Sequence, residues 1–228
     1  MQYKVMIVLV FGLLSFTISS SSSSATKNAR LSLANFEFIA DASIENTYHL
    51  LKTNNLQLPP LELFKKGLMG FYQFKEKGII QNDILTLVDF SLSSTVKRLW
   101  VIDLKNNLIL FQSLVAHGRN SGNEFAHQFS NKSESYQSSL GFYATAETYI
   151  GKHGYSLRLD GLENGINHKA RERAIVIHGA DYVSETFIQQ NGRLGRSFGC
   201  PSLPMENYKE IIDLIKNKSC LFIYFPAK

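Results

Sequence analysis

Gly195-Arg196-Ser197-Phe198-Gly199-Cys200-Pro201-Ser202, taken with the upstream pair His178-Gly179, constrains this protein more than any other part of its sequence. Cys200 stands in a turn that is rich in glycine, flanked by arginine and closed by proline, which favours a reactive thiol over a core cysteine. His178 ends the apolar run 174–177, so a buried strand would present its imidazole to a cleft. Such a histidine can act as base to a thiol from another loop. The pattern predicts a Cys/His site for acyl transfer.

The residues around this cysteine suggest supporting roles. Gly199 lets backbone N–H groups approach a developing oxyanion. Arg193 and Arg196 are expected to raise the thiolate character of Cys200 and to hold substrate carboxylates, because a guanidinium matches a carboxylate bidentately. The alternative is that both are solvated loop arginines. His117 also precedes a glycine at a strand end, so it is a second candidate to line the cleft.

Other kinds of site find little support. No pair of histidines has the helical spacing of a zinc motif and no CxxC is present, so we expect neither a metal nor a cofactor. The G-x-S-x-G turn of serine hydrolases is also absent.

The N-terminus has the layout of a secretory signal. Lys4 precedes an apolar run over residues 5–18, and Ser23 and Ala25 suit a cleavage site of small residues. Residues 1–25 are therefore predicted to be a signal peptide that directs export to the periplasm or cell envelope, with an uncleaved anchor as the alternative. The run is shorter than the ~20 apolar residues of a membrane span, so no stable membrane insertion is expected after signal removal.

Charge and cysteine content narrow the function further. The formal net charge of +5 suits an anionic polymer such as a cell wall, and no Lys/Arg run marks a nucleic-acid partner. Two cysteines in an exported chain admit a Cys200–Cys220 disulfide. Against it, Cys220 lies in the apolar stretch 219–225, where a free thiol behaves as a small buried hydrophobe. We favour one buried and one reactive thiol; the alternative is a bridged, non-catalytic wall-binding module.

The chain divides into a helical and a β-rich part. Residues 28–78 are predicted to be helical with a break at Pro59-Pro60, which gives a helical N-terminal extension over 26–80 and one catalytic domain over 81–228. A long polar loop is expected over 117–138. Further strands and helices follow from hydrophobic periodicity: strands over 85–90, 99–104, 108–116, 141–149, 155–159, 173–177 and 220–225, and helices over 183–190 and 204–217.

Several separated blocks resemble the YkuD-type L,D-transpeptidases. Ile177-His178-Gly179 followed by residues 194–201 is similar to the family signature of HG, a spacer and S/T-H-G-C. Residues 139–143, which include Gly141, resemble the strand T-P-x-G-x-F. The form HGADYVS with GRSxGCP resembles the branch called the murein L,D-transpeptidase catalytic domain family. The resemblance covers roughly residues 85–225 and implies a mainly β, sandwich-like fold with one helix after the nucleophile loop.

The resemblance also implies a reaction. Cys200 would attack a peptidoglycan stem peptide after the diamino acid at its third position, with His178 as general base. The N–H groups of Gly199 and Cys200 would form the oxyanion hole, and the Gly179 carbonyl region would orient the imidazole. An amine from another stem, or water, would release the acyl group, so an L,D-carboxypeptidase or cross-link hydrolase is the alternative. The expected substrate-binding residues are Arg193, Arg196, Ser197, Gly179, His117 and Gly141.

Two positions depart from the common signature. Phe198 stands where that signature has a second histidine, so we expect different hydrogen bonding around the thiolate. Pro201-Ser202 replaces an apolar residue followed by Arg or Asn, so the substrate carboxylate is expected to be held differently.

Overall fold

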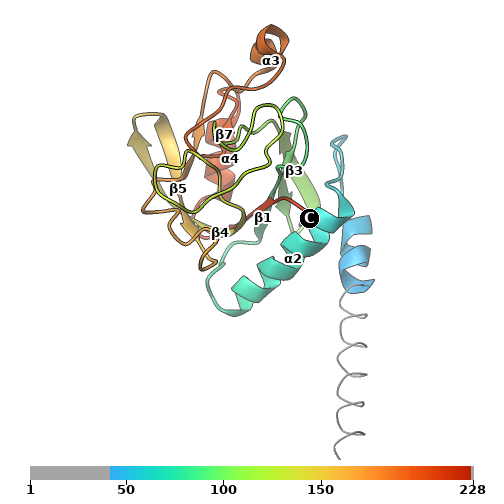
Figure 1. Ribbon diagram of the computed structural model, residues 1–228. Coiled ribbons are helices and arrows are strands. Elements are labelled where there is room, and N and C mark those ends of the chain that lie inside the picture. The colour runs from blue at the N-terminus through green and yellow to red at the C-terminus, as the bar shows by residue number, and fades with distance from the viewer. Residues whose placement is uncertain (1–41, 227–228) are drawn as a thin grey trace, which may run out of the picture. The chain divides into compact units, whose positions relative to one another are not determined.

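An eight-stranded sheet organises the described part of the chain, residues 42–226 of the computed structural model (Figure 1). The strands are β1 (Ile84–Asp89), β2 (Leu99–Asp103), β3 (Leu108–Ser113), β4 (Gly141–Gly151), β5 (Gly154–Gly161), β6 (Val176–Gly179), β7 (Ser202–Leu203) and β8 (Cys220–Tyr224). In space they run in the order β3-β2-β1-β8-β4-β5-β6-β7. β1 with β8 and β6 with β7 are parallel pairs, and the other neighbours are antiparallel. These strands confirm the predicted mainly β fold.

The two edges of the sheet approach each other near the nucleophile. Beyond β3 the chain continues to Ala116, which forms an antiparallel bridge with Ser202 of β7. The Ala116 N–H donates to the Ser202 carbonyl at 2.9 Å. The sheet is therefore nearly closed, and the residue that follows the Cys200-Pro201 pair is tied to both β6 and the end of β3.

Side chains that alternate along β1 and β8 build two hydrophobic cores. α2 (Leu61–Glu76) covers one face of the sheet, where it packs on Leu85, Leu87 and Phe222. α4 (Tyr208–Ile215) packs on the other face, where the core contains Val88, Leu221 and Ile223. Because side chains of a strand alternate between faces, the single strand β8 supplies residues to both cores. α3 (Glu185–Asn191) projects from the opposite end of the unit to α2 (Figure 1).

Several predicted boundaries change. Residues 42–49 are helical, but the expected continuation through Leu56 is wrong, because Lys52 instead forms a parallel bridge with Leu108. Asn54 and Asn55 beyond it adopt positive φ angles of 49° and 67°, which helical geometry does not allow. The strand expected from residue 173 begins at Val176, because Ala174 has a φ of 52° within a turn. β7 was not predicted, since a two-residue strand leaves no periodicity to detect.

The predicted signal peptide, residues 1–25, lies outside the described residues. Within residues 42–226, no helix combines the length and the apolar character that crossing a membrane requires.

Close packing of α2 on the sheet depends on glycine. A Cβ atom added at Gly70 would lie 2.1 Å from the ring of Phe142, which stacks on Phe222 with ring centroids 4.2 Å apart. We expect Gly70→Val to lower the free energy of unfolding by ~1–3 kcal/mol, because overpacking displaces these rings. Met69→Val is the matched control, since Met69 is exposed on the same helix. Urea denaturation of both variants tests this, and equal midpoints would contradict it.

Candidate active site

Cys200 lies against the start of β6. Its Sγ accepts a hydrogen bond from the Val176 N–H at 3.5 Å and lies 3.7 Å from the Ala174 carbonyl oxygen. Residues i and i+2 of a strand face the same side, so the Val176 and His178 side chains share one face of β6. Cys200 is partly exposed, whereas Cys220 is buried in β8, and both thiols are free. No disulfide links the two cysteines, as we favoured.

Ser197 closes the nucleophile loop upon itself. Its Oγ donates to the Cys200 carbonyl at 2.6 Å and accepts from the Gly199 N–H at 3.0 Å. Gly199 has a φ of 125°, and a Cβ atom there would lie 2.8 Å from the Gln137 carbonyl oxygen. This position therefore requires glycine. The Gly199 N–H already has a partner, so its predicted part in an oxyanion hole requires that the Ser197 hydroxyl release it.

The imidazole of His178 is buried and held at both nitrogens. Nδ1 lies 2.9 Å from the Gly179 carbonyl oxygen, which can only accept, so Nδ1 carries the proton of the neutral ring. Nε2 lies 3.0 Å from the Ser202 Oγ and accepts a hydrogen bond from the Ser202 O–H. Burial lowers the pKa of His178, the Gly179 carbonyl opposes this, and His153 adds to the decrease. The His153 ring stacks on it with centroids 4.3 Å apart.

Tyr182 extends this hydrogen-bonded chain. Its Oη lies 3.1 Å from the Ser202 Oγ. Because the Ser202 O–H donates to His178, the Ser202 oxygen accepts the hydrogen bond from the Tyr182 O–H. The donors run in one direction, from Tyr182 through Ser202 to His178 and on to the Gly179 carbonyl. Burial raises the pKa of Tyr182, the hydrogen bond with Ser202 opposes this, and negative charge on Cys200 adds to the rise. Sequence reasoning missed Tyr182, which no motif marks.

The pKa shifts of the two reacting groups favour a neutral thiol and a neutral imidazole at rest. Burial raises the pKa of the Cys200 thiol, and the Val176 N–H and the Arg173 guanidinium oppose the rise without cancelling it. The sequence led us to expect a lowered thiol pKa. The difference arises because desolvation disfavours the thiolate more strongly than the neighbouring cation favours it.

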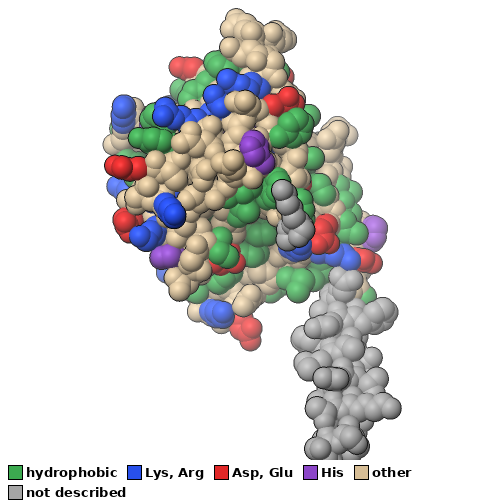
Figure 2. All heavy atoms as spheres, in the orientation of Figure 1, with side chains coloured by type: hydrophobic (Ala, Val, Ile, Leu, Met, Phe, Trp, Pro, Cys, Tyr) green, Lys and Arg blue, Asp and Glu red, His purple; other side chains and the backbone are tan. Residues whose placement is uncertain are grey.

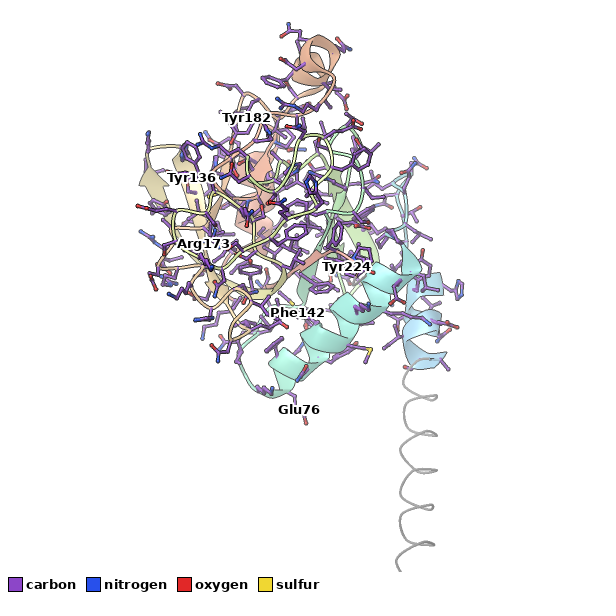
Figure 3. All side chains as sticks on the ribbon, viewed as in Figure 1. Glu76, Tyr136, Phe142, Arg173, Tyr182 and Tyr224 are labelled. Atoms are coloured by element: carbon purple, nitrogen blue, oxygen red, sulfur yellow. The ribbon has the colours of Figure 1, made fainter. Side chains whose placement is uncertain are left out.

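The cation beside Cys200 is Arg173, which sequence reasoning also missed. Its Nη1 donates to the Ser130 carbonyl at 2.6 Å, and its Nη2 donates to the Gln137 carbonyl at 2.7 Å. Arg173 thereby ties the polar loop 117–138 to the turn that precedes β6. Figure 3 shows Arg173, Tyr136 and Tyr182 in the half of the unit away from α2. Only the hydrogen bonds, and no sequence pattern, distinguish Arg173 from the other arginines.

The two predicted arginines hold the loops together. Arg193 Nη1 donates to the Leu194 carbonyl at 2.7 Å. Arg196 Nη1 donates to Asn123 Oδ1 at 2.7 Å and to the Gly122 carbonyl at 3.1 Å. Their proposed contact with substrate carboxylates stays a prediction.

His117 lies beneath the site and not on its surface. It is 1% exposed, its Nδ1 accepts from the Arg98 guanidinium at 2.8 Å, and its Nε2 lies 3.4 Å from the Gly122 carbonyl oxygen. Burial and the neighbouring Arg98 lower its pKa to about 3. This environment favours a positioning role over the predicted substrate contact.

The two remaining glycines of the predicted site are close-approach positions. A Cβ atom at Gly179 would lie 2.7 Å from the Tyr208 ring, and one at Gly141, whose φ is 94°, would lie 2.0 Å from Glu163 Oε2. Side chains thus already fill the space beside both. A substrate contact at Gly179 or Gly141 stays a prediction.

One cavity borders the candidate site, and a larger one is lined by other residues. One of about 270 Å³ lies beside the His178 ring and is lined by His153, Gly179, Ala180, Asp181, Tyr182 and Met205. A larger cavity of about 690 Å³ is lined by residues that include Glu147, Asp160 and Arg171, and none of the predicted site residues lines it. In the described part of the chain, no three His, Cys, Asp or Glu side chains come together as a metal ion requires.

Comparisons with known proteins give matches among solved structures and to one family model. Solved structures with a similar fold include an L,D-transpeptidase from Mycobacterium smegmatis (10% identity, 64% of this chain and 69% of that chain, TM-score 0.37). Another is an L,D-transpeptidase from Mycobacterium tuberculosis H37Rv (12% identity, 64% and 55%, TM-score 0.32). A third is the helical cell shape determining protein Pgp2 from Campylobacter jejuni (13% identity, 64% of this chain but less than half, 45%, of that one, TM-score 0.38). No curated protein matches the sequence.

The family match spans most of the chain. The model of the L,D-transpeptidase catalytic domain matches residues 57–224, which include Cys200, His178 and the whole of α2. The match thus begins before the predicted domain boundary at residues 80–81, which itself stays a prediction. The chain belongs to the L,D-transpeptidase catalytic domain family, whose enzymes act on peptidoglycan.

Proposed function

We propose that this protein is an exported cysteine L,D-transpeptidase that acts on peptidoglycan stem peptides through a Cys200 acyl-enzyme. The observation that carries the proposal is that one strand, β6, both contacts the Cys200 sulfur and carries His178. The Cys200 Sγ accepts from the Val176 N–H, and His178 stands two residues further along the same strand. Export rests on the sequence of residues 1–25, and the periplasm or cell envelope is the compartment in which such a substrate occurs.

The chemistry proceeds by acyl transfer. Cys200 loses its proton toward His178 Nε2 as its sulfur bonds to the carbonyl carbon of the diamino acid. The carbonyl oxygen gains the negative charge of the tetrahedral intermediate. The C–N bond then breaks, and the imidazolium returns the proton to the leaving amine. An amine from a second stem attacks the thioester carbonyl and gives up a proton to His178. The C–S bond then breaks, and the imidazolium returns that proton to the Cys200 sulfur, which regenerates the thiol.

Ser202 faces the lone pair that must receive the proton. Because its hydroxyl donates to His178 Nε2, the thiol proton reaches Nε2 by way of the Ser202 hydroxyl or after that hydrogen bond breaks. The Nδ1–H bond to the Gly179 carbonyl keeps the basic lone pair on Nε2 in either case. The raised thiol pKa and the lowered imidazole pKa favour proton transfer during attack over a preformed ion pair.

Backbone donors of the nucleophile loop would stabilise the oxyanion. In this proposal Cys200 and Gly199 supply N–H groups, and the Ser197 hydroxyl keeps the Gly199 N–H oriented until the substrate oxygen replaces it. A hydroxyl that already donates to the Cys200 carbonyl holds the loop in the same conformation throughout.

Hydrolysis is the second candidate, since water can replace the acceptor amine in the last step. The 270 Å³ cavity beside His178 favours transfer, because it offers room for an acceptor next to the base. The non-catalytic wall-binding module required a Cys200–Cys220 bridge, and the two free thiols argue against it.

Defined disaccharide-peptides test the proposal. Purified protein would be incubated with a disaccharide that bears a four-residue stem, with and without a second stem that carries a free amine, and products would be identified by mass. We expect a cross-linked product with the acceptor, and an acyl adduct on a peptide that contains Cys200. A trimmed stem alone, even with excess acceptor, would indicate hydrolysis, and no product at all would refute both.

The pH dependence of Cys200 alkylation is a further prediction. Because burial raises the thiol pKa, the thiolate fraction grows only at a higher pH than for an ordinary cysteine. Iodoacetamide labelling of Cys200 should therefore be slow at neutral pH and rise above the usual cysteine range. A labelling rate that already reaches its maximum at pH 6–7 would show a preformed thiolate and contradict this prediction.

A further inference from the structure

An exposed aromatic surface lies next to the nucleophile. Phe198, two residues before Cys200, is 60% exposed. Its ring packs against that of Tyr136 with centroids 4.9 Å apart, and the Arg119 guanidinium lies 4.6 Å from the Tyr136 centroid and 5.1 Å from the Phe198 centroid. We call these three side chains, Arg119, Tyr136 and Phe198, the platform.

The platform is joined to the nucleophile loop through the backbone. The Arg119 N–H donates to the Ser197 carbonyl at 2.8 Å. Ser138 links the same loops, because its Oγ donates to the Gly199 carbonyl at 3.1 Å. One backbone and one side-chain hydrogen bond therefore tie the loop that carries Arg119 and Tyr136 to the nucleophile loop that carries Phe198 and Cys200.

Packing does not account for the platform. Phe198 contributes to none of the hydrophobic clusters formed by the described residues. Within residues 42–226, the Arg119 guanidinium has ring contacts but no carboxylate partner. An exposed aromatic ring that carries an unpaired cation costs solvation and gains little, which is typical of a surface that binds something.

The charge around the platform favours an anion. Burial lowers the pKa of Arg196, and the positive charges of Arg193 and Arg119 lower it further, so the three guanidinium groups share one region. Arg193 and Arg196 spend donors on backbone carbonyls, whereas Arg119 keeps its donor edge available. The Arg196 guanidinium also donates to the Arg119 carbonyl at 3.3 Å. Figure 2 shows several Lys and Arg side chains beside hydrophobic ones in the upper part of the face that it draws.

We propose that the platform binds the C-terminal carboxylate of the donor stem, next to the bond that Cys200 attacks; this rests on the proposed function. In a four-residue stem the residue after the attacked bond ends in that carboxylate. Arg119 would receive it through paired N–H donors, while the rings of Tyr136 and Phe198 hold the guanidinium flat and cover the side chain of the leaving residue. Phe198 thereby takes part in substrate recognition at the position where the common signature has histidine.

Direct binding to an inactive protein separates this proposal from turnover. In a Cys200→Ala background, calorimetry would compare a disaccharide with a four-residue stem in its free-acid form against the same compound as its C-terminal amide. We expect the acid to bind about tenfold more tightly than the amide, and Arg119→Gln to abolish that preference. Lys105→Gln, the same change of charge in the exposed β2–β3 turn, should keep it.

Each outcome has one meaning. If Arg119→Gln still prefers the acid, or if the parent binds acid and amide equally, the platform does not recognise the carboxylate. If the parent binds neither compound, the proposed function itself fails. Phe198→Ala guards against misfolding, since an exposed side chain is removed; it should weaken binding of both compounds, and unchanged affinities would overturn the role of the rings.

Discussion

Cys200→Ala should abolish formation of both the acyl adduct and the cross-linked product. The variant lacks the sulfur that bonds to the substrate carbonyl, and loss of a covalent nucleophile costs on the order of 10⁶ in turnover. Cys200 is partly exposed on a loop whose conformation depends on Ser197, Ser138 and Gly199, so the fold should be unaffected. Product mass spectra and a thermal melt of the same sample test both statements.

Cys220→Val is the matched control for this prediction. Cys220 is fully buried in β8, and burial raises its pKa to about 12, so it stays a neutral core residue. A similar apolar side chain should keep full activity and cost less than about 1.5 kcal/mol of stability. Near-wild-type turnover by Cys200→Ala would refute the cysteine mechanism, as would loss of activity in a well-folded Cys220→Val.

The sequence predicted most of the fold because periodicity marks long elements. The strands β1, β2 and β8 were predicted because they are apolar runs bounded by turn residues. The resemblance of residues 85–225 to the L,D-transpeptidases implied the same mainly β fold. What the sequence could not predict depends on tertiary pairing. The parallel alignment of β1 with β8 joins residues far apart in the chain, and β7 exists only because Ser202 pairs with His178 and Ala116.

The candidate site was predicted only in part. The sequence could propose Cys200 and His178 as candidates, because a reactive thiol and a strand-end histidine have local sequence contexts. Arg173 and Tyr182 were missed, since their importance arises from hydrogen bonds to the 117–138 loop and to Ser202. The direction of the Cys200 pKa shift could not be predicted from the sequence either, because desolvation depends on the packing around the thiol and not on the residues adjacent to it in the chain.

His178→Ala should lower turnover by ~10²–10⁴, the usual contribution of a general base. Ser202→Ala should be intermediate: His178 keeps its Nδ1–H bond to Gly179 but loses the hydroxyl that holds Nε2, for a loss of roughly tenfold in kcat. Imidazole ¹⁵N chemical shifts provide a readout that a purely structural role would not move. Both proteins should show the Nδ1–H tautomer that the Gly179 carbonyl fixes, and the Nε2 chemical shift should change in Ser202→Ala because Nε2 loses its hydroxyl donor.

His117→Ala is the informative comparison, because His117 also ends a strand before a glycine. Its removal takes an acceptor from Arg98, which is fully buried and whose pKa burial lowers to about 9. A buried donor left without a partner costs ~1–3 kcal/mol, so this variant should melt at a lower temperature. Labelling of Cys200 per folded molecule should nevertheless stay near that of the wild type, whereas His178→Ala should slow it at neutral pH. If His117→Ala instead suppresses labelling and His178→Ala does not, the base belongs to the strand end before Gly118, and the chain from Tyr182 through Ser202 has only a structural role.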